Sequence, residues 1–311
     1  MKQESTRLAV SNTLMELAEQ DPKTVFISTD SLLVIKGQEF KQKFPERCLE
    51  LGIAEQNGVD VAAGLAATGM KPYLATYAGF ITMRACEQVR TFVAYPELPV
   101  TLIGANGGIG AGGREGVTHQ FFEDIGILRT IPGVTILVPA DAQQTIQAVR
   151  AASEINGPVY IRIGSGRDPV VYEEPVPFEV GKAHIVVSYG FDTVIYAYGS
   201  LLYRALRAAE QLHNENINIT VVDVHTIRPL DTKTILETAE KTSSIITLED
   251  HNINGGLGSA VCEVLSEHAP NRILRLGVPD CFTRSGKSEE LLDYYGLSID
   301  SIKQHVKDRL L

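Results

Sequence analysis

Short apolar runs alternate with amphipathic stretches along the chain. In the first half, runs rich in β-branched residues are typical of buried strands, and the stretches between them repeat apolar positions at helical spacing. The expected strands are 24–28, 72–77, 100–105, 134–139 and 159–163, and the expected helices are 5–19, 55–68, 81–94 and 142–155. Nearly continuous apolar strands that alternate with helices predict a parallel sheet covered on both faces.

A break in this pattern separates two halves of the chain. Residues 167–181 are rich in Pro and Glu, which is typical of an extended linker. In the second half the expected strands are 193–197, 217–222 and 244–248, and the expected helices are 202–212 and 233–241, with further helices after Gly255 and Ser298. We therefore expect an α/β protein of two domains, residues 1–186 and 187–311, each with a mostly parallel sheet flanked by helices.

The charge narrows the class of partner. The 311 residues include 28 Lys and Arg against 38 Asp and Glu, a net charge of −10. Without a basic run, the sequence argues against a nucleic-acid partner.

No stretch approaches the roughly 18 apolar residues of a membrane helix. The scattered cysteines form no CxxC pair, which is typical of free thiols in a reducing compartment. We expect a cytoplasmic protein with no membrane partner.

The first segment with candidate chemistry is residues 52–57. Its Glu55 is expected to open a helix of small residues, where the helix dipole and free N–H groups favour a carboxylate. That placement is also a common structural feature. The apolar neighbours Leu51, Ile53 and Ala54 would suit a buried carboxylate that exchanges protons, so both interpretations stay open.

A second segment, residues 107–120, is rich in Gly and follows an expected strand. Residues 108–113 formally match GxGxxG. That dinucleotide fingerprint should open directly into a helix and meet an acidic residue about twenty positions later, where this chain has Ile131. The presence of Glu115 and His119 favours a substrate loop instead, and a lone surface histidine is the alternative.

Three other segments have both a functional and a structural interpretation. Tyr77 and Phe80, between a strand and a helix, either line a site for a planar ring or pack in the core. Arg162 and Arg167 follow a strand end, where α/β sheets bind ligands, and either hold an anion or form interdomain ion pairs. Residues 249–259 predict a strand, a glycine turn and a helix start, for which packing without a ligand is the simpler interpretation.

Taken together and in this order, these segments resemble the transketolase family. The strings that carry the resemblance are GIAEQN (52–57), AAGLAATGMKP (62–72), YAGF (77–80), GGREGVTHQ (112–120), PADA (139–142), IRPLD (227–231) and EDHNINGGLGS (249–259). The match spans nearly the whole chain but only the C-terminal two of that family's three domains. It is especially close to separately encoded C-terminal subunits of split transketolases and to the matching half of 1-deoxy-D-xylulose-5-phosphate synthase.

The resemblance implies a pyrimidine-binding domain followed by a transketolase C-terminal domain, with thiamine diphosphate and Mg²⁺ as cofactors. In that family a GDG string marks the domain that holds the metal and the diphosphate, and this chain has no such string. The resemblance therefore implies a partner subunit that supplies the metal ligands, in an A2B2 heterotetramer, and no metal ligands in this chain.

The resemblance also assigns roles to individual positions. The residues implied in catalysis are Glu55 and His119. Those implied in binding the cofactor are Glu55, Tyr77, Phe80 and Asp30, and those implied in binding the substrate are Glu115, His119, Arg162 and Arg167.

At two positions implied in substrate binding, this sequence differs from the usual pattern of the family. Glu115 stands where the family usually has Asp, and Ser165 stands where a second arginine is expected, with Arg167 two positions further on. An anion site that lacks one guanidinium is weaker. The terminal group could therefore be a phosphate or another anion such as a sulfonate.

The leading hypothesis is the pyrimidine-binding subunit of a split transketolase, which moves a two-carbon ketol unit from an anionic ketose to an aldose. One alternative is the β subunit of a 2-oxoacid dehydrogenase E1 component, although a loop with Glu115 fits sugar hydroxyls better. The other is a non-catalytic partner subunit with the same fold, against which the presence of Glu55 and His119 counts.

Overall fold

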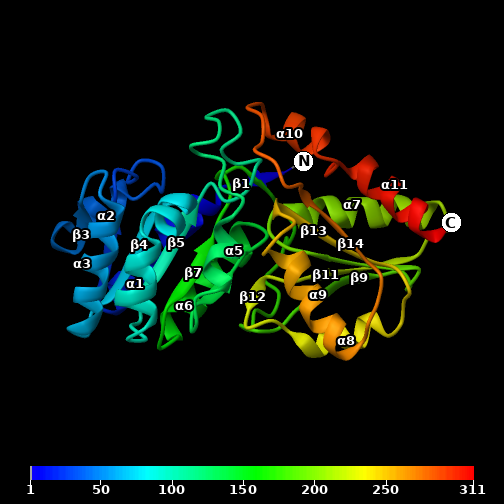
Figure 1. Ribbon diagram of the computed structural model, residues 1–311. Coiled ribbons are helices and arrows are strands. Elements are labelled where there is room, and N and C mark those ends of the chain that lie inside the picture. The colour runs from blue at the N-terminus through cyan, green and yellow to red at the C-terminus, as the bar shows by residue number, and fades with distance from the viewer. Residues whose placement is uncertain (1) are drawn as a thin grey trace.

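The computed structural model describes residues 2–311 and arranges them around two sheets (Figure 1). The first sheet has seven strands in the order β12-β6-β7-β5-β4-β2-β3, and every pair except β12–β6 is parallel, as the apolar runs predict. Its strands are β2 (Thr24–Ser28), β3 (Cys48–Glu50), β4 (Lys71–Tyr77), β5 (Thr101–Ala105), β6 (Thr135–Leu137), β7 (Val159–Arg162) and β12 (Thr226–Arg228).

Helices cover both faces of the first sheet. Helices α1 (Thr6–Gln20) and α6 (Ala142–Glu154) pack against each other on one face, and α3 (Glu55–Ala67) and α5 (Asp124–Arg129) lie on the other. Phe26 packs into the core beneath α1, whereas its neighbours Val25 and Ile27 pack into the core beneath α3. This is the period of two expected of a strand that is buried on both faces. Helix α2 (Gln38–Lys43) and the short turn η1 (Pro45–Arg47) connect β2 to β3.

Residues 80–94 differ from the single α-helix expected over 81–94. They form two π-helical turns, η2 (Phe80–Arg84) and η3 (Val89–Ala94), around a short α4 (Cys86–Gln88). The Ala85 N–H donates to the Phe80 carbonyl five positions earlier at 3.2 Å. Apolar spacing does not distinguish these wider turns from an α-helix, and π-turns are frequent at functional sites.

The second sheet has five strands in the order β14-β13-β10-β11-β9, antiparallel only at the β9 edge. Helices α7 and α11 cover one face and α8 and α9 the other (Figure 1). The strands are β9 (His184–Ser188), β10 (Thr193–Ala197), β11 (Ile219–Asp223), β13 (Ile245–Asn252) and β14 (Ile273–Val278), and the helices are α7 (Leu201–Asn214), α8 (Thr232–Ala239), α9 (Leu257–His268), α10 (Ser288–Tyr294) and α11 (Ile299–Leu310). The expected domain boundary after residue 186 lies within β9 and stays a prediction.

The two halves of the chain are joined by more than the connecting segment. Strand β12 follows β11 in the chain but pairs with β6 at the edge of the first sheet. One apolar core includes Ile27 and Leu102 of the first half and Tyr196 and Ile245 of the second. Within residues 167–181 the only regular structure is β8 (Asp168–Pro169), paired with β1 (Gln3–Glu4). No helix within residues 2–311 is long and apolar enough to cross a membrane.

Candidate functional site

Parallel strands of the first sheet end at one edge, and the candidate residues follow these ends. Tyr77 is the last residue of β4, Arg162 is the last residue of β7, and Asp30 lies two residues after β2. Residues 107–120, which we call the glycine loop, come two residues after the end of β5. The carboxyl ends of parallel strands are where α/β proteins bind ligands.

Glu55 is the first residue of α3, and only 2% of its surface is exposed. Arg84, from η2, donates to Glu55 Oε2 at 2.7 Å. The same guanidinium lies over the Phe80 ring, 4.2 Å from its centre. Because a buried carboxylate is costly unless it is paired, Arg84 stabilises Glu55 in this position while keeping part of its own side chain in solvent.

Four rings, which we call the aromatic group, lie next to this ion pair: Tyr77, Phe80, His119 and Phe121. The His119 ring is 5.0 Å from that of Tyr77 and 5.6 Å from that of Phe80, and both contacts are edge-on. Phe121 lies 5.3 Å from Phe80, and a Cβ at Gly79 would come within 1.9 Å of the Phe121 ring. The structure thus brings together Glu55, Tyr77, Phe80 and His119, which the sequence singles out, whereas Phe121 is not among the expected residues. Arg84 contacts both the carboxylate and the Phe80 ring.

A polar group borders Tyr77. Arg7, in the first turn of α1, donates to Asn106 Oδ1, and Asn106 Nδ2 donates to Glu115 Oε2 at 3.3 Å. Burial raises the pKa of Tyr77, and the nearby Glu115 carboxylate raises it further. Arg7 Nε is buried and has no hydrogen-bond partner within residues 2–311. A buried N–H without an acceptor is costly, so this donor points to a group that it would bind.

Sequence reasoning missed both Arg7 and Arg84. Arg7 lies 99 positions from Asn106 in the chain. The sequence holds one local signal for Arg7: a basic residue in the first turn of a helix is unfavourable with the helix dipole, so its presence there is unusual. Arg84 lies within the segment that apolar spacing assigned to an ordinary helix, and no pattern there indicates its contact with Glu55.

The two arginines after β7 have different surroundings. Arg162 is 3% exposed; its Nε donates to Asp124 at 2.9 Å and its Nη1 to Asp250 at 2.6 Å. The interdomain ion pair that the sequence offers as the structural alternative is therefore present at Arg162. Arg167 is exposed and lines a cavity of about 280 Å³, with Tyr203 and Arg204 of the second half.

Asp30 is exposed and has a left-handed backbone, with a φ of 54°. Its N–H donates to Glu50 Oε1 at 2.5 Å. The hydroxyl of the next residue, Ser31, lies 2.9 Å from that of Thr76, which directly precedes Tyr77. Asp30 therefore lies on the same edge of the sheet as the aromatic group.

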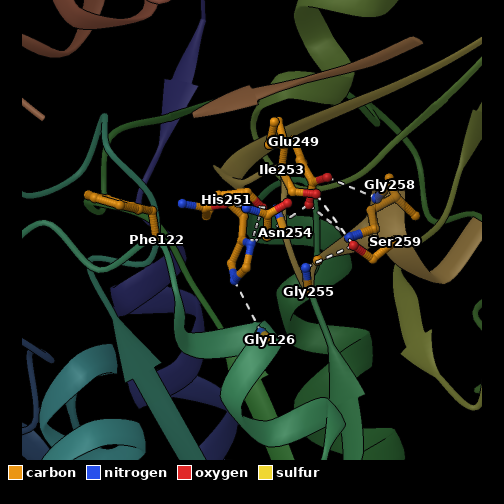
Figure 2. A network of polar contacts seen from close by, with 12 residues as sticks. Phe122, Gly126, Glu249, His251, Ile253, Asn254, Gly255, Gly258 and Ser259 are labelled. Atoms are coloured by element: carbon orange, nitrogen blue, oxygen red, sulfur yellow. Dashed lines mark hydrogen bonds and ion pairs between the residues drawn. The ribbon is translucent and has the colours of Figure 1, made fainter. Parts of the chain in front are cut away.

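The segment 249–259 packs tightly onto the first half (Figure 2). Glu249 accepts hydrogen bonds from the N–H groups of Leu257 and Gly258 at 2.7 and 2.8 Å, so a side chain of this protein occupies the start of α9. Burial raises the pKa of Glu249 to about 8. This agrees with the simpler interpretation, a glycine turn with helix packing.

The site as a whole offers two kinds of contact. Glu55 with Tyr77 and Phe80 provides a buried carboxylate beside ring faces, which suits a flat heteroaromatic ring that carries a hydrogen-bonding group. His119, Glu115 and the free Arg7 N–H provide an imidazole, a carboxylate and a guanidinium, which suit a hydroxylated and anionic compound.

Comparison with known proteins agrees with this description. Residues 2–166 match the model of the transketolase pyrimidine binding domain, and residues 181–302 match that of the transketolase C-terminal domain. An apulose-4-phosphate transketolase subunit of Phocaeicola vulgatus is 39% identical over 298 residues, 95% of this chain and 94% of that protein. The 6-deoxy-6-sulfo-D-fructose transketolase subunit SqwH of a Clostridium species is 37% identical over 289 residues, 93% and 89% of the two chains. A solved split-gene transketolase, described as an inactive β4 tetramer, has a TM-score of 0.89 at 39% identity and covers 99% of each chain.

Proposed function

This chain belongs to the transketolase family, and we propose that it is the pyrimidine-binding subunit of a two-chain transketolase that acts on anionic sugars. It would move a two-carbon ketol unit from a ketose with an anionic terminal group to an aldose. The observation that carries the proposal is the buried Glu55 carboxylate beside Tyr77, Phe80 and His119. Similar proteins named as transketolase subunits support it. We propose a division after residue 186 between the pyrimidine-binding and C-terminal domains.

Thiamine diphosphate fits the carboxylate and the rings. Glu55 would bond its aminopyrimidine, Tyr77 and Phe80 would pack on the ring, and Asp30 would contact it from the neighbouring strand end. When bound, the cofactor supplies a thiazolium carbon that accepts and releases the two-carbon unit. The chain has no GDG string, so we propose that the partner subunit supplies the ligands of Mg²⁺ and the diphosphate.

The remaining residues would act on the sugar. The His119 imidazole would hold or move a proton at a substrate oxygen, and Glu115 would accept hydrogen bonds from sugar hydroxyls. Arg7 and Arg167 would contact the anionic terminal group, with the free Arg7 Nε–H as a donor. Arg162 is left out of this set because Asp124 and Asp250 already pair its guanidinium.

A partner subunit would cover the apolar surface beside Glu55. Ile53, Met83, Phe92 and Tyr95 are exposed, and they lie on or next to α3, η2 and η3. Large exposed apolar side chains that gather in one region are typical of interaction surfaces. We propose that this surface binds the diphosphate-binding subunit in an A2B2 heterotetramer. The similar split-gene enzyme, inactive as a β4 tetramer, supports the need for a second kind of chain.

The state of the four cysteines is relevant to the cellular compartment of the protein. All four are free in the structure. Free thiols are typical of a reducing compartment, which supports the proposal of a cytoplasmic enzyme.

Calorimetry of thiamine diphosphate with Mg²⁺ tests the proposal. A GDG-containing subunit that co-purifies with this chain is separated from it. The titration is then made on this chain alone, on that subunit alone, and on the mixture of the two. We expect binding only in the mixture, together with turnover of apulose 4-phosphate or 6-deoxy-6-sulfo-D-fructose and not of a 2-oxoacid. Binding in none of the three would favour a non-catalytic subunit. Tight binding by this chain alone would contradict the assignment of its domains.

A further inference from the structure

The glycine loop holds His119 but has little regular structure of its own. Fourteen residues without helix or strand are expected to move unless other parts of the molecule hold them. One bond within this region closes the loop, because the Gly108 N–H donates to the Phe121 carbonyl at 2.6 Å. Asn106 contacts Glu115, and the rings of Tyr77 and Phe80 contact His119, within the first half of the chain. Further contacts that hold the loop come from the second half of the chain.

The segment 283–288, which ends at the first residue of α10, contacts the loop at three places. Ser288 Oγ donates to the Gly110 carbonyl, and the Gly286 N–H donates to the Gly113 carbonyl at 2.9 Å. The third contact involves Gln120, directly after His119 and only 2% exposed.

Both the NH2 group and the oxygen of the Gln120 side-chain amide are hydrogen-bonded. Its Nε2 donates to the Arg284 carbonyl at 2.7 Å, and its Oε1 accepts from Thr283 Oγ1 at 2.8 Å. A buried amide with both ends bonded holds one orientation, because any rotation leaves a polar group unpaired.

The end of β13 contacts the chain just after the loop. The Asn252 N–H donates to the Phe122 carbonyl at 2.7 Å, and the Gly126 N–H, in the first turn of α5, donates to His251 Nε2 at 3.1 Å (Figure 2). N–H groups in the first turn of a helix have no partner within the helix. His251 therefore provides, from the other half of the chain, the acceptor that α5 lacks.

The protonation of His251 agrees with this role. Its Nδ1 donates to the Asn252 carbonyl at 2.7 Å, which leaves Nε2 as the acceptor for the Gly126 N–H. His251 is fully buried, and burial lowers its pKa, which favours the neutral ring.

We propose that Gln120 and His251 are positioning residues, through which the C-terminal half sets the place of the His119 imidazole in the active site. This rests on the proposed function. The contacts of Gln120 fix the backbone next to His119. The contact of His251 fixes Gly126 in the first turn of α5, six residues after Gln120. Because a displacement of about 1 Å at a reacting group can cost about a hundredfold in rate, these contacts bear on catalysis without touching the substrate.

Three variants test the proposal in the assembled enzyme. Thr283→Val removes the donor to Gln120 while keeping the shape, and His251→Leu removes the acceptor for Gly126. His251→Gln places an amide oxygen near Nε2 and should rescue much of the loss. The matched control is Tyr196→Phe, since its buried hydroxyl bonds Ile235 and Thr238 within the C-terminal half.

Two readouts apply to each variant. We expect kcat to fall about tenfold to a hundredfold in Thr283→Val and His251→Leu, with the Kd for thiamine diphosphate within about twofold of wild type. Hydrogen exchange of the amides in 107–126, measured on the full chain, should speed up in both and stay unchanged in Tyr196→Phe.

Hydrogen exchange tests the positioning role of Gln120 and His251 separately from the proposed transketolase activity. If the wild-type complex transfers no ketol unit, the proposed function fails, while exchange still reports whether these side chains hold the loop. Unchanged exchange and kcat in Thr283→Val and His251→Leu would overturn the positioning role. If His251→Leu does not fold, Thr283→Val decides the outcome.

Discussion

The Arg84 guanidinium donates to the buried Glu55 carboxylate at 2.7 Å and also lies over the Phe80 ring. One side chain thereby contacts two of the four residues that we assign to the pyrimidine of the cofactor. Arg84 is the last residue of the π-turn η2, and Glu55 is the first residue of α3. The pair gives Glu55 a partner within the subunit itself.

Arg84→Met should lower the free energy of unfolding by about 1–3 kcal/mol, because it leaves the buried Glu55 carboxylate without this partner. Combined with Glu55→Gln, the loss should be smaller than the sum of the two single losses, which urea unfolding measures. Arg150→Met, which breaks the exposed pair with Glu16, is the control and should cost less than about 1 kcal/mol. Strict additivity of the two changes would show that Arg84 and Glu55 are not coupled.

Glu55→Gln should lower ketol transfer by at least about a hundredfold, since the amide does not exchange a proton as the carboxylate does. The assay uses the subunit together with its GDG-containing partner. The melting temperature and the far-UV circular dichroism should stay close to those of wild type. Activity that is unchanged in this variant would rule out the assigned mechanism.

His119→Ala should reduce ketol transfer about a hundredfold or more while the Kd for thiamine diphosphate changes little, because the imidazole is assigned to the sugar. Kinetics and calorimetry on the same preparation give both numbers. His213→Ala, which removes a ring stacked on Tyr189 at the surface of the C-terminal half, is the control. Equal loss of transfer and of cofactor binding would mean that His119 is structural.

Arg7→Ala should raise the KM for an anionic ketose by about tenfold to a hundredfold, the range expected when one charged hydrogen bond is lost. The kcat should change much less, since Arg7 is assigned to the terminal group and not to the reacting carbons. A ketose without a terminal anion should be turned over equally by the variant and the wild type. Equal effects on the charged and the uncharged ketose would contradict the assignment of Arg7.

Glu249→Gln should change how stability depends on pH. Burial raises the pKa of Glu249 to about 8, so the folded chain keeps this proton where the unfolded chain has lost it. The stability that this group contributes is fully present below the ordinary carboxyl pKa and is lost as the pH rises toward about 8, by at most about 1.4 kcal/mol for each pH unit.

Urea unfolding between about pH 5 and pH 8 measures this slope, which Glu249→Gln should flatten, besides any constant loss from weaker capping of α9. Glu267→Gln, on the exposed end of α9, should leave the slope as in wild type. An identical slope in wild type and Glu249→Gln would show that this carboxyl does not titrate in the range.

Local pattern predicts the parts of the site that depend on neighbours in the chain. The run of small residues after Glu55 predicts α3 and places the carboxylate at its first position. The apolar runs predict where β4 and β7 end, and with them the edge that carries Tyr77 and Arg162. These features follow from spacing, which the sequence shows directly.

Contacts between distant segments are not predictable in this way. Arg162 is expected to bind substrate, but its carboxylate partners lie 38 and 88 positions away, and only the fold brings them to it. Arg7 likewise meets Asn106 only because β1 and β8 pair and bring the start of the chain beside the end of β7. The π-turns are not predicted because the spacing of apolar residues over one or two turns does not distinguish a π-helix from an α-helix.

Strand β12 has a consequence for dissecting the protein. A fragment that ends after residue 186 would lack the strand that pairs with β6 and would expose a row of unpaired backbone groups along that edge. Such edges recruit strands from other molecules. The N-terminal half made by itself would therefore tend to aggregate, and adding back the C-terminal half in trans during refolding should suppress this by complementing the missing edge.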